Sequence, residues 1–253
     1  MKHRLSLNVS KIEYESGPAR GEARAVVERP YVLLSCGMSI DGYLDTATGQ
    51  RLLLSNDADF DRVDAVRAAS DAIMVGAGTI RQDNPRLLVR SAARRDDRVA
   101  RGLRPNPVKV TVTSRGELDP AGRFFAGDAE KLVYCASAAF DAARERLGDL
   151  ATVVDGGDPV DLRRMLADLN ARGVRRLMVE GGERVHTQFL TAGLVDELHL
   201  VVAPFFVGDS RAPRFVGDGA FPWSPDHRAT LAEVRQIGDV VLLRYALSDR
   251  FPA

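Results

Sequence analysis

An acidic residue followed by two glycines is the clearest sign of chemistry in this sequence. Glu180, Gly181 and Gly182 end an apolar, strand-like run at 177–179, and an amphipathic, helix-like segment follows at 183–190. Without Cβ atoms, such a turn lets backbone N–H groups at a helix N-terminus approach a phosphate closely. Ligands of α/β proteins commonly bind at the carboxyl ends of strands. The motif therefore predicts a phosphate site, although many α/β proteins use the same turn purely for packing.

A second glycine motif follows the apolar run 72–75. Residues 76–78 read Gly-Ala-Gly, and Thr79, Asp83 and Arg90 come after them. Thr79 offers a hydroxyl, Asp83 a carboxylate, and Arg90 a guanidinium that can bind a phosphate through two hydrogen bonds. We interpret 76–78 as a glycine loop that carries ligand-binding side chains. The alternative is a surface turn broken by a proline, with Arg90 in solvent.

Three further side chains are candidates because of the elements that should carry them. Ser114 and Arg115 follow the strand-like run 108–113. A hydroxyl and a guanidinium at a strand end suit an adenosine 2′-phosphate, which would select NADPH over NADH; an exposed turn is the alternative. Arg67 lies one helical turn beyond an apolar position, so we expect it at the inner edge of a helix. There it could anchor a substrate phosphate together with Arg90.

The composition is that of an ordinary globular protein. Of 253 residues, 45% are hydrophobic, and 35 basic residues balance 35 acidic ones. Nucleic-acid and anionic-membrane surfaces need a basic excess, so we expect neither partner. The sequence contains no apolar stretch of the roughly 18 residues that a spanning helix needs, and its N-terminus lacks the apolar core of a signal peptide. We therefore expect a cytoplasmic protein. The basic cluster at 94–104 is interpreted as a solvated loop.

The cysteines and histidines do not suggest a metal site. Cys36 and Cys135 lie far apart and have no His or Cys near them at metal-ligand spacing. We expect both to be small buried side chains, without a metal or a disulfide. His186 and His199 lie in a helix-like and a strand-like segment, and neither has the neighbours of a hydrolytic triad.

Strand-like and helix-like segments alternate from residue 31 onward. Strands are expected at 31–36, 72–75, 108–113, 131–134, 152–154, 176–179 and 197–203, and helices at about 56–67, 138–147, 158–173 and 183–193, the third one opened by Asp158 and Pro159. The runs 231–237 and 240–247 flank Gly238-Asp239, a turn typical of an antiparallel hairpin. The pattern predicts one α/β domain with a mixed, mostly parallel sheet, helices on both faces and a C-terminal hairpin. Residues 1–29 lack periodicity and are expected to form an irregular extension before a domain at 30–250.

With these motifs in view, the chain resembles the reductase of riboflavin biosynthesis. That reductase is the C-terminal half of a bifunctional deaminase–reductase in bacteria and stands alone in archaea and fungi. The matching segments are 37–42, 66–68, 73–90, 179–182 and 193–197 leading to 203–204, in the family's order. The resemblance implies a dihydrofolate reductase-like fold, NADPH as hydride donor and a homodimer. The implied substrate is a 5-phosphoribosylamino pyrimidine whose ribose is reduced to a ribityl chain.

The resemblance also assigns residues. Cofactor-contacting positions are matched by Gly37 or Met38, Leu53, Thr79, Asp83, Ser114, Gly181, Gly182, Glu183, Arg184 and Val185, and Arg115 joins them through its place beside Ser114. Substrate-contacting positions are matched by Arg67, Leu87, Arg90 and Glu180. We expect Glu180 to bind substrate first and to donate a proton second, with Asp83 as the other catalytic carboxylate. Asp41, in an Asp-Gly turn, is interpreted as structural.

Several alternatives remain open. The substrate is either the deaminated uracil or the undeaminated diaminopyrimidinone, or, in a divergent reductase, another pterin- or pyrimidine-like compound. A Rossmann dehydrogenase would need G-x-G-x-x-G, but Arg81 stands where the third glycine belongs. A nucleotide-binding domain without turnover would have no use for Arg67, Arg90 and Glu180.

Overall fold

The fold is one nine-stranded sheet with helices packed against it. The computed structural model describes residues 28–48 and 52–252, so the expected extension at 1–29 lies almost entirely outside the described residues. The strands are β1 (Tyr31–Ser39), β2 (Ala72–Gly76), β3 (Val108–Thr113), β4 (Lys131–Cys135), β5 (Thr152–Asp155), β6 (Arg176–Gly181), β7 (Glu197–Ala203), β8 (Thr230–Ile237) and β9 (Val240–Ala246). The helices are α1 (Asp57–Ala68), α2 (Ala77–Asp83), α3 (Ala92–Ala100), α4 (Phe140–Leu147), which follows the 3-10 turn η1 (Ser137–Ala139), α5 (Leu162–Ala171) and α6 (Glu183–Thr191).

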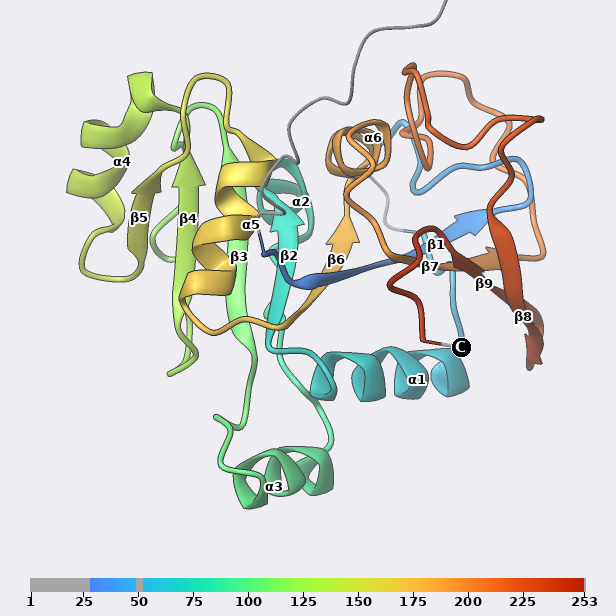
Figure 1. The fold of residues 1–253 in the computed structure, drawn as a ribbon, viewed down its shortest axis with the longest axis horizontal. Coiled ribbons are helices and arrows are strands. Elements are labelled where there is room, and N and C mark those ends of the chain that lie inside the picture. Colours follow the sequence, from blue (N-terminus) through green and yellow to red (C-terminus); the bar gives the residue numbers. More distant parts are fainter. Residues whose placement is uncertain (1–27, 49–51, 253) are drawn as a thin grey trace, which may run out of the picture.

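The strand order explains where a ligand can bind. It is β5-β4-β3-β2-β6-β1-β7-β9-β8, and the first seven strands in this order are parallel (Figure 1). β9 pairs antiparallel with β7 and β8, which confirms the predicted C-terminal hairpin. The parallel arrangement brings the carboxyl ends of β1, β2, β3 and β6 to one edge of the sheet, which is where ligands of open α/β sheets bind.

Alternating side chains bury both faces of the parallel part of the sheet. On one face, Val32 and Leu34 belong to a core that includes Met165 of α5 and Phe189 of α6. On the other face, residues of β2 belong to a second core with α2 and α4. Successive strand residues point to opposite faces, so near-continuous apolar strands such as 72–75 require cover on both sides. The predicted arrangement of helices on both faces is confirmed.

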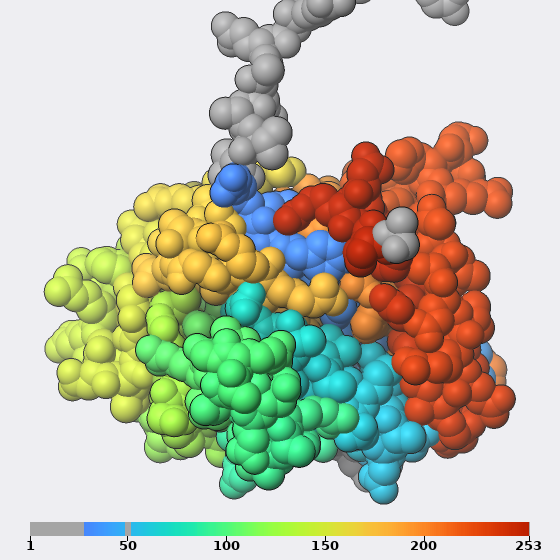
Figure 2. All heavy atoms as spheres, turned by 60° about the horizontal axis from the view of Figure 1, so that its bottom comes forward, coloured from blue at the N-terminus to red at the C-terminus, as the bar shows by residue number. Residues whose placement is uncertain are grey.

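Helices α1 and α3 lie side by side at the lower front of Figure 2, in cyan and green, with α1 between α3 and the red C-terminal segment. Asn56 caps α1 by accepting a hydrogen bond from the Asp59 N–H, 3.0 Å away. Among the helices that the structure describes, none is long and apolar enough to cross a membrane.

Three local predictions were wrong. The presumed glycine loop at 76–78 is the start of α2, with Gly76 as N-cap; a Cβ on Gly76 would lie 2.8 Å from a methyl group of Val185, so its glycine permits close packing instead. The presumed solvated loop at 94–104 contains α3, which Ser91 caps. The helix expected from residue 158 begins at Leu162, because Asp161 accepts the N–H groups that cap it.

Candidate active site

A large cavity opens at the carboxyl edge of the parallel strands. Its volume is about 1690 Å³, and β1, α1, α2, the end of β3 and the β6–α6 turn contribute to its walls. Most of the predicted site residues line it: Gly37, Leu53, Arg67, Thr79, Asp83, Arg90, Ser114, Arg115, Glu180, Gly182, Glu183, Arg184 and Val185. Segments far apart in the sequence therefore meet in one place.

The diglycine turn presents the open N-terminus of α6 to this cavity. Gly182 is the N-cap, with φ +95°, and no side chain caps the helix. A Cβ on Gly182 would lie 2.9 Å from the Thr79 hydroxyl oxygen, and the Thr79 hydroxyl in turn donates to the Gly181 carbonyl, 3.4 Å away. Glycine is therefore required for both backbone conformation and space. The free amides of the first turn can bind a phosphate.

Glu183 lies in the first turn of α6, but its carboxylate is engaged by another segment and does not cap the free N–H groups of that turn. Its carboxylate accepts a hydrogen bond from the backbone N–H of Arg214, 2.6 Å away. Arg214 also donates to the Tyr43 hydroxyl, at 2.9 Å, and stacks over the Tyr43 ring. Glu183 thus fastens the segment before Phe215 to the start of α6, while Arg184 remains exposed at the cavity.

Arg67 and Glu180 form a bidentate ion pair across the cavity floor. The Arg67 Nε and Nη2 atoms each lie 2.6 Å from a Glu180 carboxylate oxygen, and both side chains are largely buried. Burial opposes the charged form of Arg67, but Glu180 outweighs it and raises the pKa of the guanidinium. Arg67 is therefore paired with a carboxylate and holds Glu180 in place, and its contact with a substrate phosphate stays a prediction.

Arg90, unlike Arg67, leaves its guanidinium open to the cavity. Its side chain is exposed at the cavity and its guanidinium lies 5.4 Å from the centre of the Phe60 ring. Within residues 28–48 and 52–252, this guanidinium forms no ion pair with an acidic side chain. Asp64 accepts the Arg90 backbone N–H and so fixes the residue's position from the α1 side.

Ser114 and Arg115 lie at the end of β3, exposed on the same cavity. The Thr113 hydroxyl oxygen accepts hydrogen bonds from the N–H groups of Arg115 and Gly116, at 3.4 and 3.1 Å, and so shapes the turn. Arg115 Nε is 3.3 Å from a Glu117 carboxylate oxygen, but both side chains are more than half exposed. Such surface pairs are weak, so an anionic ligand can compete for Arg115.

Three predicted residues do not line the cavity. Leu87 was expected to contact substrate, but its side chain is buried in the core beside Ile73 and Phe124. Gly37 faces the cavity, so strand alternation turns Met38 away, and Met38 packs against the opposite core. Gly181 lies behind the turn, where a Cβ would come within 2.8 Å of His186 Nε2. Leu87 and Met38 thus turn their side chains into the core, whereas contacts of these three residues with a bound ligand stay predictions.

Asp41 has the structural role that its turn suggested. Its carboxylate accepts hydrogen bonds from the Ser39 hydroxyl, at 2.6 Å, and from the N–H groups of Val207 and Gly208. These contacts tie the end of β1 to the loop after β7.

Sequence reasoning missed Ser55, Asp59 and Arg62, which also line the cavity. Asp59 is 2% exposed; Arg62 Nε donates to one of its carboxylate oxygens, at 2.6 Å, and the Ser55 hydroxyl donates to the other. The acid and the arginine are three residues apart, so they share one helix face. The sequence signal that could have located them was the pair of Asp59 and Arg62 on the helix face that also carries Val63.

Both cysteines and His186 are buried in the described part of the chain. Cys36 and Cys135 are buried, and burial raises the pKa of both thiols. In the described part of the chain, no three His, Cys, Asp or Glu side chains are grouped to hold a metal. His186 is fully buried; burial lowers its pKa to about 4, although the hydrogen bond to the Phe215 carbonyl acts in the opposite direction.

The comparisons with known proteins agree with this geometry. The family model of the RibD C-terminal domain matches residues 30–243. A 2,5-diamino-6-ribosylamino-4(3H)-pyrimidinone 5′-phosphate reductase of Archaeoglobus fulgidus is 34% identical over 224 residues, which are 88% of this chain and 99% of the relative. The protein of the same name from Methanothermobacter thermautotrophicus is 35% identical over 87% of this chain and 99% of its own length.

Solved structures show the same fold. A pyrimidine reductase-like protein from Corynebacterium diphtheriae superposes with a TM-score of 0.75 and 25% identity, over 86% of this chain and 91% of the other. The RibD protein of Acinetobacter baumannii superposes with a TM-score of 0.71 and 24% identity, over 86% of this chain and 58% of that one. The expected dihydrofolate reductase-like architecture is confirmed.

Proposed function

The chain belongs to the RibD C-terminal domain family of pyrimidine reductases, and from this premise we propose that it reduces the ribose of a 5-phosphoribosylamino pyrimidine to a ribityl chain with NADPH in riboflavin biosynthesis. The observation that supports this best is the single cavity that joins the diglycine turn, Arg90 and the Arg67–Glu180 pair. A cofactor-binding domain without turnover would need only the first of these.

The residues fit a nicotinamide dinucleotide phosphate. Gly182 leaves a space that a Cβ would fill, directly in front of the uncapped amides of α6. These amides would hold the pyrophosphate, with the Thr79 hydroxyl beside them. Ser114 and Arg115 would hold the 2′-phosphate, which is the basis for proposing NADPH over NADH. When bound, the nicotinamide supplies the hydride that reduces the sugar.

The remaining residues bind and orient the sugar. Opening of the ribosylamine ring gives an imine at C1, which needs a hydride at carbon and a proton at nitrogen. Arg90 would bind the 5′-phosphate, because a guanidinium matches phosphate geometry through two hydrogen bonds. Glu180, held by Arg67, accepts hydrogen bonds from the substrate, and Asp83 on the cavity wall is the proposed proton donor while Glu180 stays paired.

The test of phosphate recognition is Arg90→Ala, assayed by NADPH oxidation. We expect kcat/KM for the phosphorylated substrate to fall by about 100-fold, the scale of losing charge-assisted hydrogen bonds. The dephosphorylated analogue, already poor, should change little. Arg86→Ala is the matched control, because Arg86 is exposed on the same segment but does not line the cavity. An equal loss for both substrates would make Arg90 structural.

The test of cofactor choice is Arg115→Ala. NADPH binding should weaken by about 1–3 kcal/mol, as expected for one charge-assisted hydrogen bond, and NADH binding should hardly change. Calorimetric titration with each cofactor measures both. Equal weakening for the two cofactors would show that Arg115 does not contact the 2′-phosphate.

We further propose a cytoplasmic homodimer. The phosphorylated substrate and NADPH are both charged metabolites that stay in the compartment where they form. For the dimer, the C-terminal hairpin supplies the surface. Leu231 and Val234 of β8 and Val241 of β9 are 51%, 59% and 37% exposed, and they lie on one face of the hairpin. Contiguous exposed apolar side chains of this kind mark protein interfaces.

A further inference from the structure

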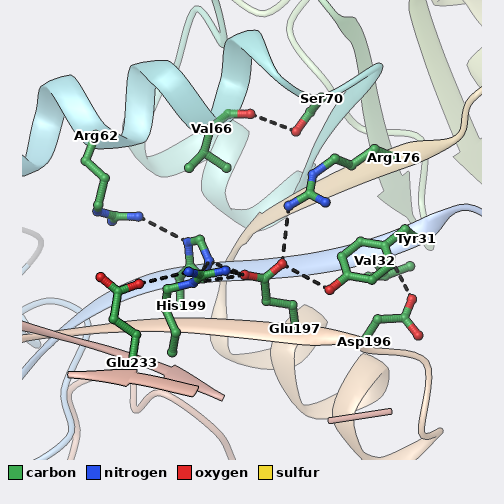
Figure 3. A network of polar contacts seen from close by, with 11 residues as sticks. Tyr31, Val32, Arg62, Val66, Ser70, Arg176, Asp196, Glu197, His199 and Glu233 are labelled. Atoms are coloured by element: carbon green, nitrogen blue, oxygen red, sulfur yellow. Dashed lines mark hydrogen bonds and ion pairs between the residues drawn. The ribbon is translucent and has the colours of Figure 1, made fainter. Parts of the chain in front are cut away.

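A buried polar network runs inward from the outer hairpin, and Figure 3 shows its part from Glu233 through Glu197 and His199 to Arg62. From Arg62 it continues through Asp59 to Ser55, which lines the cavity. We propose that Ser55 contacts the substrate as a hydrogen-bond acceptor only, and that it thereby selects the undeaminated 2-aminopyrimidinone over the 2-oxo pyrimidine. This inference rests on the proposed function and specifies which heterocycle the site takes. Asp59, Arg62 and His199 are positioning residues in this arrangement.

At the centre of the polar network lies Glu197, which is on β7 and is 1% exposed. Its carboxylate oxygens receive hydrogen bonds from Arg244 Nη2, at 2.6 Å, from the Tyr31 hydroxyl, at 3.0 Å, and from Arg176 Nη2, at 3.2 Å. Burial opposes ionisation, but His199 and Arg244 outweigh it and lower the pKa of Glu197 to about 2. Glu197 is therefore a fixed anion and a fixed acceptor.

His199 connects Glu197 to Arg62 through its two ring nitrogens. Its Nε2 is 2.6 Å from a Glu197 carboxylate oxygen, and its Nδ1 is 3.2 Å from Arg62 Nη1. An arginine can only donate, so Nδ1 accepts from Arg62, and the short 2.6 Å contact with Glu197 assigns the ring hydrogen to Nε2. Arg244 Nε lies 3.1 Å from this Nε2 and equally 3.1 Å from a Glu197 carboxylate oxygen, and it donates to that oxygen. Burial, with Arg62 and Arg244 nearby, lowers the pKa of His199 against the opposing effect of Glu197, consistent with a neutral ring.

Arg62 is thereby held in one orientation toward Asp59. Its Nη1 is occupied by His199 and its Nε by an Asp59 oxygen, at 2.6 Å. The other Asp59 oxygen receives the Ser55 hydroxyl hydrogen. The Asn56 carbonyl is a distant second acceptor, 3.5 Å from the Ser55 oxygen. A carboxylate is the stronger acceptor, so the single hydrogen of Ser55 is committed to Asp59.

What Ser55 then offers to the cavity is a pair of oxygen lone pairs. A hydroxyl normally adapts to either a donor or an acceptor by rotating its hydrogen. Ser55 cannot rotate its hydrogen toward the cavity, because Asp59 holds it. A substrate carbonyl facing Ser55 would therefore place two hydrogen-bond acceptors against each other. Sugar hydroxyls can donate to it or accept elsewhere, so they give no discrimination. The two heterocycles differ at ring position 2, where an amino group donates and an oxo group accepts. The relatives that match nearly the whole chain are named as reductases of the 2,5-diamino compound.

The experiment compares kcat/KM for the 2-amino and 2-oxo substrates in four proteins. The wild type should favour the 2-amino substrate by about tenfold or more, the scale of one hydrogen bond against an unmatched acceptor. In Ser55→Ala this ratio should fall toward one. In Asp59→Asn it should reverse, because the asparagine oxygen must face Arg62, its NH₂ then donates to Ser55, and the Ser55 hydrogen turns to the cavity. Ser70→Ala is the matched control: Ser70 is buried, donates to the Val66 carbonyl 2.9 Å away and does not line the cavity, so the ratio should be unchanged.

The result that overturns the proposal is a wild-type ratio kept in Ser55→Ala. If Asp59→Asn fails to fold, Ser55→Ala alone decides. A wild type that reduces neither compound would refute the proposed function, and calorimetric affinities for the two compounds in wild type and Ser55→Ala would then test the inference separately. His199→Leu should lower the ratio and His199→Gln, whose amide can accept from Arg62 and donate to Glu197, should restore it. A purely structural role for His199 would change stability and leave the ratio alone.

Discussion

Glu180 and Gly182 show how much the residue scale depends on immediate neighbours. Arg67 holds the Glu180 carboxylate from one side, which leaves that carboxylate able to accept hydrogen bonds from the other side. Any side chain at position 182 would collide with the Thr79 hydroxyl, so glycine there keeps the backbone accessible to a ligand. Neither property belongs to the residue type alone. Changes of one atom or one methyl group at these positions should therefore have effects that the same changes elsewhere do not.

Gly182→Val should abolish NADPH binding while the protein stays folded. The branched side chain would collide with the Thr79 hydroxyl and fill the space before the α6 amides. Gly173→Val is the matched control, since Gly173 has φ +90° but open space around its Cβ position, so it reports backbone strain alone. Calorimetry with NADPH measures the difference. Normal affinity in Gly182→Val would make this turn a packing feature.

His186 should make the protein acid-sensitive. Its pKa is about 4 in the folded state and ordinarily ~6.5 in an unfolded chain. Between these values the unfolded state binds more protons, so the free energy of unfolding decreases as pH falls from about 6.5 to about 4 and levels off below. Denaturant titrations across this range should show a slope, at most ~1.4 kcal/mol per pH unit from this group. The slope should be smaller in His186→Asn, and identical slopes would exclude His186 as the cause.

At the scale of elements, α3 acts as a clamp on α1. Arg98, 3% exposed, donates from Nη1 to the carbonyls of Ala68 and Ser70, both at 2.7 Å, and from Nε to the Arg104 carbonyl. The first two carbonyls belong to the end of α1 and the turn after it. A buried guanidinium thus satisfies backbone groups that a helix end leaves open. Since α1 carries Ser55's partners and Arg67, this clamp supports the cavity from outside.

Arg98→Ala should lower the free energy of unfolding by about 3 kcal/mol, because it leaves buried carbonyls without donors. Arg101→Ala, at the C-terminus of the same helix, should cost less than about 0.5 kcal/mol, since its ion pair with Asp97 is exposed. Chemical denaturation of both variants measures the contrast. Similar small losses would mean that water replaces the Arg98 side chain without cost.

At the scale of the whole molecule, the hairpin β8–β9 extends the sheet beyond the helices that cover its parallel part. Most of β8 is exposed, and Leu231 and Val234 present apolar surface that the described part of the chain does not cover. Arg244 donates hydrogen bonds to both Glu233 and Glu197, and so connects the same hairpin to the polar network around Glu197. The proposed dimer surface and the polar network that leads to Ser55 therefore share one element, the β8–β9 hairpin.

Val234→Glu should convert the proposed homodimer to a monomer, because a charge buried at an apolar interface lacks a partner. Val99→Glu is the control, since Val99 is 55% exposed on α3, away from the hairpin. Sedimentation velocity distinguishes the two species. A dimer that survives Val234→Glu would place its interface elsewhere.

The sequence by itself determined the sheet and most of the cavity wall. Apolar runs located β2, β3, β6 and β7, and the residues that the strand-end motifs singled out, Thr79, Ser114 and Gly182, line one cavity because parallel strands bring their carboxyl ends to one edge. Tertiary structure decided which charges meet. Arg67 and Glu180 are 113 residues apart, and nothing local to either shows that they pair. Arg98 was assigned to a loop because local composition is polar, whereas its partners are carbonyls in another helix. Ser55 became a one-way acceptor only through contacts that lead to β7 and β9, and such long-range polarity is set by packing rather than by pattern.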